Sequence, residues 1–313
     1  MKYESYRQID KIVDELCAEQ KYEEAIELLG NAQKQFPNDL FEILWYEAII
    51  YALSGNHENC LVTLENMTAK GFFGELEWNI FNPLRDDARF KVIFEASQRL
   101  KAEAQKSARM EYQVYTPEGY SSEQQYPLFI ALHGDGNSLA YFKSNWEATG
   151  LLDTGFVLVY IQSSQVICAD GFGWTPNYET TRQDVKAAYD KVVRQYSVDV
   201  DNILIGGFSG GAIAAIEITM ANTLSVKGFI SLCPSRKPAS FSRGNVERAA
   251  QRGVKGVFME GEKEGEVPAE QEMIEVFKEA NFPYQFHINS NVGHAFPQDF
   301  EQKLLDAIVF IMN

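Results

Sequence analysis

From residue 109 onward, short runs of apolar residues alternate with segments of helical periodicity. Unbroken apolar runs of this length are typical of strands that are buried on both faces of a parallel sheet. Parallel strands need long crossovers, so the alternation predicts an α/β fold, a mostly parallel sheet with helices on both faces. Strands are expected at 111–115, 128–132, 156–161, 203–205, 229–232, 254–259 and 284–288, and helices at 184–196, 268–280 and 301–311. A functional site in such a fold lies beyond the carboxyl ends of the strands.

Residues 1–108 differ from the rest, because their apolar residues recur at helical spacing and β-branched runs are few. The segment from Lys21 to Pro37 resembles the second helix of a tetratricopeptide repeat, and a weaker copy follows from Gly55 at a period close to the roughly 34 residues of that family. A third, degenerate unit is expected over 75–100, with a helix that starts at Asn82–Pro83. The sequence thus predicts a small all-α, tetratricopeptide-like domain at 1–108 before a catalytic domain at 109–313; a helical bundle without repeats is the alternative.

The charge and the cysteines exclude several classes of protein. There are 44 acidic and 28 basic residues, a net charge of −16 that repels nucleic acid. The longest strongly apolar stretch, 156–161, is far too short to span a membrane, and the N-terminus lacks the pattern of a secretory signal. Four scattered cysteines show no CxxC spacing, which favours reduced thiols and a cytoplasmic location over disulfides or a zinc site.

Ser209 is the candidate nucleophile. It lies in Gly207-Phe208-Ser209-Gly210-Gly211, a G-x-S-x-G pattern between an apolar strand and an Ala-rich helix. The glycines permit a sharp strand-to-helix turn that exposes the hydroxyl, and the helix N-terminus offers N–H groups to a developing anion. The alternative is a glycine-rich turn around a passive serine.

His294 is the candidate base among the four histidines of the chain. It follows the last expected strand, in a loop before the final helix. His57 falls in the helical region, His287 within a strand, and His133 at the end of a strand beside the expected oxyanion loop. Histidine is the side chain whose pKa allows it to accept and return a proton near neutral pH.

The acid that would orient His294 is expected after the strand at 254–259. The loop there contains no Asp but several Glu residues. Glu264 is the preferred candidate and Glu262 the next, although a run of Glu can also be ordinary solvated surface. The chain order Ser, Glu, His is the one expected for this type of site.

Two further loops supply the expected oxyanion hole and pocket. The segment after residue 132 reads His-Gly-Asp-Gly-Asn, and backbone N–H groups of Asp135 and Gly210 are the expected donors, with Gly134 as the alternate. The candidate substrate-binding residues are Trp174, His133 and Phe208. Trp174 lies in an aromatic, glycine-rich loop that could wall a pocket, or it could be an ordinary packing residue.

The motifs LHGDGN, GGFSGG and GHAFP, in this order, resemble the α/β-hydrolase superfamily. Within it, the short HGxGN loop and the Gln-Ser-Ser-Gln after a strand are similar to phospholipase/carboxylesterase and dienelactone-hydrolase-like esterases. The resemblance covers about residues 109–313 and implies an α/β-hydrolase fold and a serine hydrolase that needs no cofactor. Two features depart from the pattern: the acid is Glu rather than the more usual Asp, and a helical domain precedes the catalytic one.

The first functional hypothesis is a serine esterase in which Ser209 attacks a small acyl or aryl ester, His294 acts as base and then acid, and Glu264 orients the imidazole. Thioesters and amides remain open as substrates. The alternative is a catalytically inert scaffold, or a binding module whose helical repeats take a protein or peptide or associate with themselves. No metal, cofactor, nucleic acid or membrane is expected as a partner.

Overall fold

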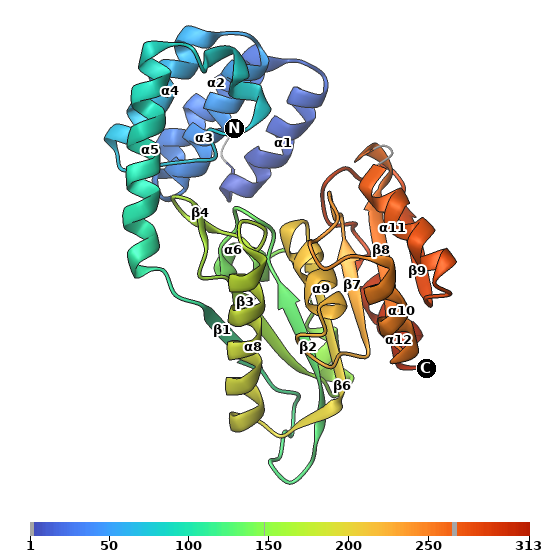
Figure 1. Cartoon of the computed structure of the whole chain (residues 1–313). Helices are drawn as coiled ribbons and strands as arrows, with labels where there is room; N and C mark the ends of the chain where they lie inside the picture. The colour runs from blue at the N-terminus through green and yellow to red at the C-terminus, as the bar shows by residue number, and fades with distance from the viewer. Residues whose placement is uncertain (1–2, 147, 265–267) are drawn as a thin grey trace. The chain divides into compact units, whose positions relative to one another are not determined.

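The computed structural model describes residues 3–146, 148–264 and 268–313 and divides into two compact units. The helical unit comprises residues 1–107 together with residues 167–170, and the sheet unit comprises residues 108–166 and 171–313. Figure 1 shows the elements of both units. No helix among the described residues combines the length and the apolar character that crossing a membrane requires.

The sheet unit is built on seven strands in the order β1-β3-β2-β6-β7-β8-β9. The first strand, β1, runs antiparallel to β3, and the other neighbours pair in parallel. The strands are β1 (Glu111–Tyr115), β2 (Tyr126–Leu132), β3 (Val157–Gln162), β6 (Val198–Phe208), β7 (Gly228–Leu232), β8 (Lys255–Gly261) and β9 (Tyr284–Asn289); β4 (Val166–Cys168) and β5 (Gly171–Phe172) form a separate pair. The α/β fold with a mostly parallel sheet, predicted from the alternation of apolar runs and helices, is confirmed.

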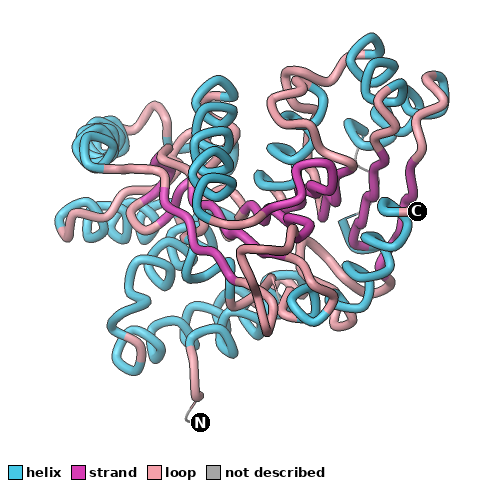
Figure 2. The backbone as a smooth tube through the Cα atoms, turned by 90° about the horizontal axis from the view of Figure 1, so that it is seen from below, coloured by secondary structure: helices cyan, strands magenta, loops and turns pink. Residues whose placement is uncertain are grey.

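Helices cover both faces of this sheet, and Figure 2 shows the strands between them. In β2, Leu128, Ile130 and Leu132 point to the face covered by α8, α9, α10 and α11, whereas Phe129 and Ala131 point to the face covered by α6, α7 and α12. Both faces are therefore buried, which is why the strands read as unbroken apolar runs. The helices are α6 (Leu139–Lys143), α7 (Gly150–Asp153), α8 (Tyr178–Gln195), α9 (Gly210–Met220), α10 (Arg243–Gln251), α11 (Pro268–Glu279) and α12 (Phe300–Met312), with a short 3₁₀ helix η3 (Glu262–Glu264).

The helical unit consists of consecutive helices that pack against one another. They are α1 (Tyr6–Ala18), α2 (Tyr22–Gln35), α3 (Leu40–Leu53), α4 (His57–Ala69) and α5 (Ala88–Ser107), with 3₁₀ helices η1 (Pro37–Asp39) and η2 (Asn79–Leu84). Small buried residues, among them Ala25, Ala48 and Cys60, lie where the helices approach, and Cys60 Sγ donates to the carbonyl of Ala48. That this stack is of the tetratricopeptide type stays a prediction.

One expectation for the helical unit was wrong. Asn82–Pro83 does not start the last helix but lies inside the 3₁₀ helix η2. The α-helix begins at Ala88, because Asp87 accepts the N–H groups of Arg89 and Phe90 and so caps the first turn.

The four residues 167–170 belong to the helical unit although both flanking segments belong to the sheet unit. Ile167 and Cys168 are buried with Phe41, Phe81 and other residues of that core. The N–H of Ala169 also donates to the carbonyl of Phe73 at 2.9 Å. Nothing in the local sequence pattern predicts this exchange.

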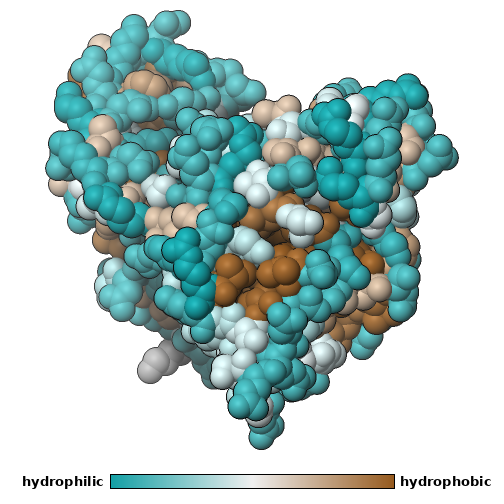
Figure 3. All heavy atoms as spheres, turned by 60° about the horizontal axis from the view of Figure 1, so that its bottom comes forward, coloured by the Kyte–Doolittle hydropathy of each residue, from teal (hydrophilic) through white to brown (hydrophobic). Residues whose placement is uncertain are grey.

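Charged residues make up 23% of the chain. Figure 3 shows one face, where hydrophilic residues surround an area in which hydrophobic side chains gather.

Candidate active site

Ser209 lies in the turn between β6 and α9 and adopts a strained backbone conformation, with φ of 52° and ψ of −117°. A non-glycine residue at positive φ is uncommon and indicates a backbone held by its surroundings. Here the Ser209 N–H donates to the carbonyl of Leu232 at 2.8 Å. The neighbours must lack side chains, because a Cβ at Gly211 would lie 2.2 Å from the Leu132 carbonyl oxygen and one at Gly207 would lie 2.5 Å from the Gly211 carbonyl oxygen. The turn therefore holds the Ser209 side chain at the carboxyl end of the central strand.

His294 comes from the loop between β9 and α12 and reaches Ser209, with 2.9 Å between its Nε2 and the Ser209 Oγ. On the other side of the ring, Nδ1 lies 3.1 Å from Oε1 of Glu264, at the end of η3. A carboxylate only accepts, so the proton belongs on Nδ1 and Nε2 is left to accept the Ser209 hydroxyl proton. The structure thus brings together the three residues that the sequence singled out from three separate loops.

Glu262, the second candidate for the acid, has a different partner. Its Oε2 accepts the N–H of Asn291 at 2.8 Å, and the neighbouring N–H of Lys263 donates to the carbonyl of Val292 at the same distance. These two hydrogen bonds join the loop of Glu264 to the loop of His294. Glu262 therefore fixes the distance between the loops while Glu264 faces the imidazole.

The expected oxyanion loop follows β2. Among the described residues, the N–H groups of Asp135 and Gly210 donate no hydrogen bond, so both are available to another acceptor. The Asp135 side chain is otherwise engaged: its Oδ1 accepts the N–H of Trp174 at 2.7 Å, and its Oδ2 accepts the Thr175 hydroxyl. Arg236 lies 3.7 Å from Oδ2 and offsets part of this charge beside Gly210.

His133 and Trp174, expected to contact substrate, are both 0% exposed, so neither side chain offers a surface to a ligand in this structure. The Trp174 Nε1–H donates to the His133 carbonyl at 3.0 Å, and the two rings lie 5.0 Å apart. The His133 ring contacts the Gly134 carbonyl through Nδ1 at 2.7 Å and receives the N–H of Ser163 on Nε2 at 3.2 Å. Burial lowers the pKa of His133 to about 4, so the ring is neutral near pH 7. His133 and Trp174 therefore pack behind the site and hold its loops in place.

Phe208 is the expected pocket residue that does lie at the site. It is only partly buried, and its ring centroid lies 5.0 Å from that of His294. It also packs at 4.6 Å against Phe296, a residue that sequence reasoning missed. The position of Phe296, two residues after His294, was the sequence signal that could have identified it as a site residue. These rings form an apolar wall beside Ser209 and His294.

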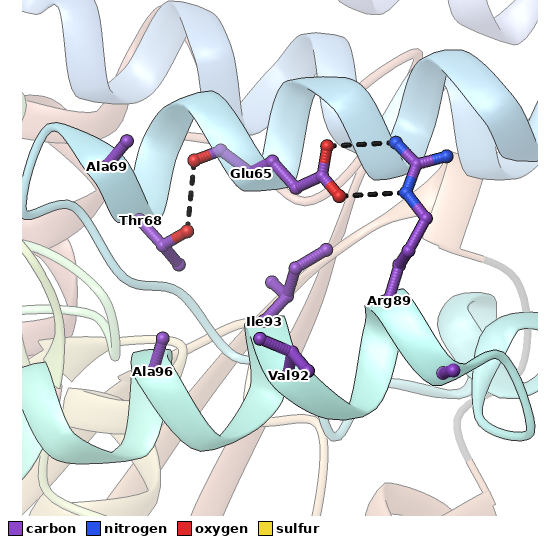
Figure 4. Close-up of a pocket in the computed structure, with 8 residues that line it drawn as sticks. Glu65, Thr68, Ala69, Arg89, Val92, Ile93 and Ala96 are labelled. Atoms are coloured by element: carbon purple, nitrogen blue, oxygen red, sulfur yellow. Dashed lines mark hydrogen bonds and ion pairs between the residues drawn. The ribbon is translucent and has the colours of Figure 1, made fainter.

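The helical unit has a groove of about 580 Å³ between α4 and α5. Figure 4 shows that its polar side chains point at one another: Arg89 donates to Glu65 at 2.8 and 2.9 Å, and the Thr68 hydroxyl donates to main-chain carbonyls. The groove is lined by Glu65, Thr68, Ala69, Ala88, Arg89, Val92, Ile93 and Ala96. Its polar groups are already paired, so it lacks the convergent, available groups of a reactive site.

No group of three or more His, Cys, Asp or Glu side chains is placed to hold a metal ion within the part of the chain that the structure describes. The chemistry that the Ser209 arrangement supports is nucleophilic attack by a hydroxyl with a histidine as proton acceptor.

Comparison with known proteins agrees with this fold. Residues 164–307 match the model of the dienelactone hydrolase family. A crystal structure of an uncharacterized protein from Bacillus cereus ATCC 10987 is similar over 98% of both chains, at 24% identity and a TM-score of 0.55. The Bacillus cereus carboxylesterase is similar over 67% of this chain and 99% of its own, at 16% identity and a TM-score of 0.50. The dienelactone hydrolase-like promiscuous phosphotriesterase P91 from metagenomic libraries is similar over 66% of this chain and 93% of its own, at 14% identity and a TM-score of 0.51.

At these identities, the similar structures establish a shared fold. A search of curated proteins found no match to the sequence. The family match covers both Ser209 and His294. Residues 164–307 are therefore similar to the dienelactone hydrolase family, within a unit that has the α/β-hydrolase fold and is preceded by an all-helical region.

Proposed function

We propose that this protein is a serine hydrolase that cleaves small acyl or aryl esters through an acyl-enzyme on Ser209. The family match supports a hydrolase that acts on esters. One observation supports the finer proposal most: Ser209, His294 and Glu264 form an unbroken line of contacts at 2.9 and 3.1 Å, with the serine in a strained turn.

In the proposed reaction, Ser209 Oγ attacks the ester carbonyl while His294 Nε2 takes the hydroxyl proton. The negative charge on the carbonyl oxygen is held by the N–H groups of Asp135 and Gly210, with Gly134 as the alternate donor. Collapse of this intermediate breaks the ester C–O bond, and the alcohol leaves with the proton from His294. Water, deprotonated by His294, then releases the acid and restores Ser209.

Glu264 keeps the Nδ1 proton in place and stabilises the imidazolium that forms in each step. The apolar wall of Phe208 and Phe296 would receive the acyl or alcohol group. His294 is 40% exposed, so water reaches the acyl-enzyme without a lid that opens.

The test is hydrolysis of p-nitrophenyl esters from acetate to decanoate by the wild type and Ser209→Ala. Loss of the nucleophile costs on the order of 10⁶ in kcat in a serine hydrolase. Ser121→Ala, an exposed serine in the same unit, is the matched control and should retain full activity. A folded wild type that hydrolyses none of the esters and takes no fluorophosphonate label would support the inert scaffold, and the groove between α4 and α5 would then be the place to seek a ligand.

A further inference from the structure

Two buried glutamates lie on either side of Glu264 in the chain. Glu260 is near the end of β8 and Glu270 is in the first turn of α11, and each is only 3% exposed. The charge of Glu260 and a hydrogen bond with it help to raise the pKa of Glu270, so the two carboxyl groups lie next to each other. Their contact therefore joins the strand before Glu264 to the helix after it.

The surroundings do not supply the donors that two carboxylates need. Glu260 Oε1 accepts the N–H of Gly261 at 3.1 Å, but Glu260 Oε2 and Glu270 Oε1 have no donor among the described residues. Neither group has an ion-pair partner there. Two buried carboxylates in contact cannot both be charged, whereas one proton between them satisfies both orphan oxygens.

We propose that Glu260 and Glu270 share one proton and so act as a positioning pair that holds the Glu264 loop against His294. The positioning part of this proposal rests on the esterase function proposed above. While the proton is present, the pair forms a hydrogen bond that links β8 to α11. Once the proton is lost, the two carboxylates repel each other.

The described groups around the pair bring no positive charge to it. From η3 comes Glu264, and from the turn after β7 comes the thiol of Cys233, which is 1% exposed. From β9, Asn289 donates its Nδ2 to the main-chain carbonyl of Glu260 at 3.0 Å. Burial first, and then the charge of Glu260, raise the pKa of Glu270 to about 9. Burial first, and then the charge of Glu260 and a hydrogen bond with it, raise the pKa of the Cys233 thiol, so the thiol stays neutral and brings no positive charge to the pair.

Stability against pH tests the shared proton without reference to activity. The folded protein keeps the Glu270 proton up to about pH 9, whereas an unfolded glutamate releases it near 4.3. Unfolding therefore releases one proton between these values, and this contribution to stability is lost as the pH rises from 5 to 9. Glu270→Gln keeps an N–H donor for Glu260 but cannot titrate. The unfolding midpoint of this variant, relative to that of the wild type, should therefore increase as the pH rises from 5 to 9.

The positioning role is tested by the pH profile of kcat/KM for a p-nitrophenyl ester. In the wild type, activity should fall about tenfold per pH unit above pH 9 as the pair loses its proton. This alkaline loss of activity should be absent in Glu270→Gln. In Glu270→Ala, which has no hydrogen-bond donor for Glu260, activity should be lower than that of the wild type at every pH. Glu275→Gln, on an exposed position of the same helix, is the control and should match the wild type in both measurements.

Parallel stability curves for the wild type and Glu270→Gln would overturn the shared proton. A proton linkage with the same alkaline loss of activity in both proteins would overturn the positioning role. A wild type without esterase activity would refute the proposed function and with it the positioning role, while the stability curves would still decide whether the proton is shared.

Discussion

His133 uses both ring nitrogens to hold the loops beneath Ser209. Its Nδ1–H donates to the carbonyl of Gly134, and its Nε2 accepts the N–H of Ser163. The bond from Ser163 needs the neutral ring, because a proton on Nε2 would remove its acceptor and bury a charge. His133, which takes no part in the proposed reaction, thus helps to fix the position of the oxyanion loop.

This arrangement predicts a loss of stability in acid. The pKa of His133 is about 4 in the folded protein and about 6.5 in an unfolded chain, so the unfolded state gains a proton first as the pH falls. The free energy of unfolding should therefore drop by about 3 kcal/mol between pH 6.5 and 4. In His133→Asn, urea unfolding should show a lower stability at pH 7 but a flatter acid dependence. His287→Asn, at an exposed position of β9, should follow the wild type; parallel curves for all three would contradict the prediction.

Sequence reasoning singled out Ser209 and His294 because each lies in a motif whose neighbours dictate the turn. It could not tell that Trp174 points inward, since an aromatic residue in a glycine-rich loop suits a pocket wall and a core equally well. Trp174 is 0% exposed and its indole donates a hydrogen bond to His133, a residue 41 positions away in the chain. Contacts between distant loops leave no local pattern.

At the scale of elements, the loop of η3 and the loop after β9 form one structure. Two hydrogen bonds at 2.8 Å join them, one from the Asn291 N–H to Glu262 and one from the Lys263 N–H to Val292. A Cβ at Gly261 would lie 2.2 Å from the Gly293 carbonyl oxygen, so the loops also touch closely at the end of β8. Glu262 and Glu264 therefore act on His294 in different ways.

The two glutamates should separate in their kinetics. Glu264→Gln keeps the shape but removes the charge that holds the Nδ1 proton, so kcat should fall about 10³- to 10⁴-fold. Glu262→Gln weakens one loop contact and should lower kcat about tenfold or less, with a reduced unfolding midpoint. Equal losses of kcat in the two variants, at equal stability, would show that the assignment of Glu264 as the acid is wrong.

The strands and long helices were predictable because burial on both faces leaves unbroken apolar runs and a helix leaves a 3.6-residue period. The helix α10 and the β4–β5 pair were not foreseen. The helix α10 is nine residues long and mostly polar, and β5 has two residues, so neither carries enough of a pattern. Short elements of this kind form because their surroundings fix them.

At the scale of the whole molecule, the two units are not two consecutive pieces of chain. Residues 167–170 belong to the helical unit, and two of them complete its core: Ile167 is 1% exposed and Cys168 is 7% exposed. Cutting the chain at residue 108 would therefore separate these side chains from the core that buries them.

This interleaving predicts opposite effects of one substitution in two contexts. In the full chain, Ile167→Ser removes a buried side chain from the core of the helical unit and should lower its stability by about 2–5 kcal/mol. In a fragment of residues 108–313, Ile167 loses its core and becomes an exposed apolar residue, so the same substitution should raise the soluble yield. Val200→Ser, which is 51% exposed in β6, should change neither quantity. A fragment that is as soluble as the full chain without any substitution would show that residues 167–170 find cover elsewhere, and that the sheet unit folds without its neighbour.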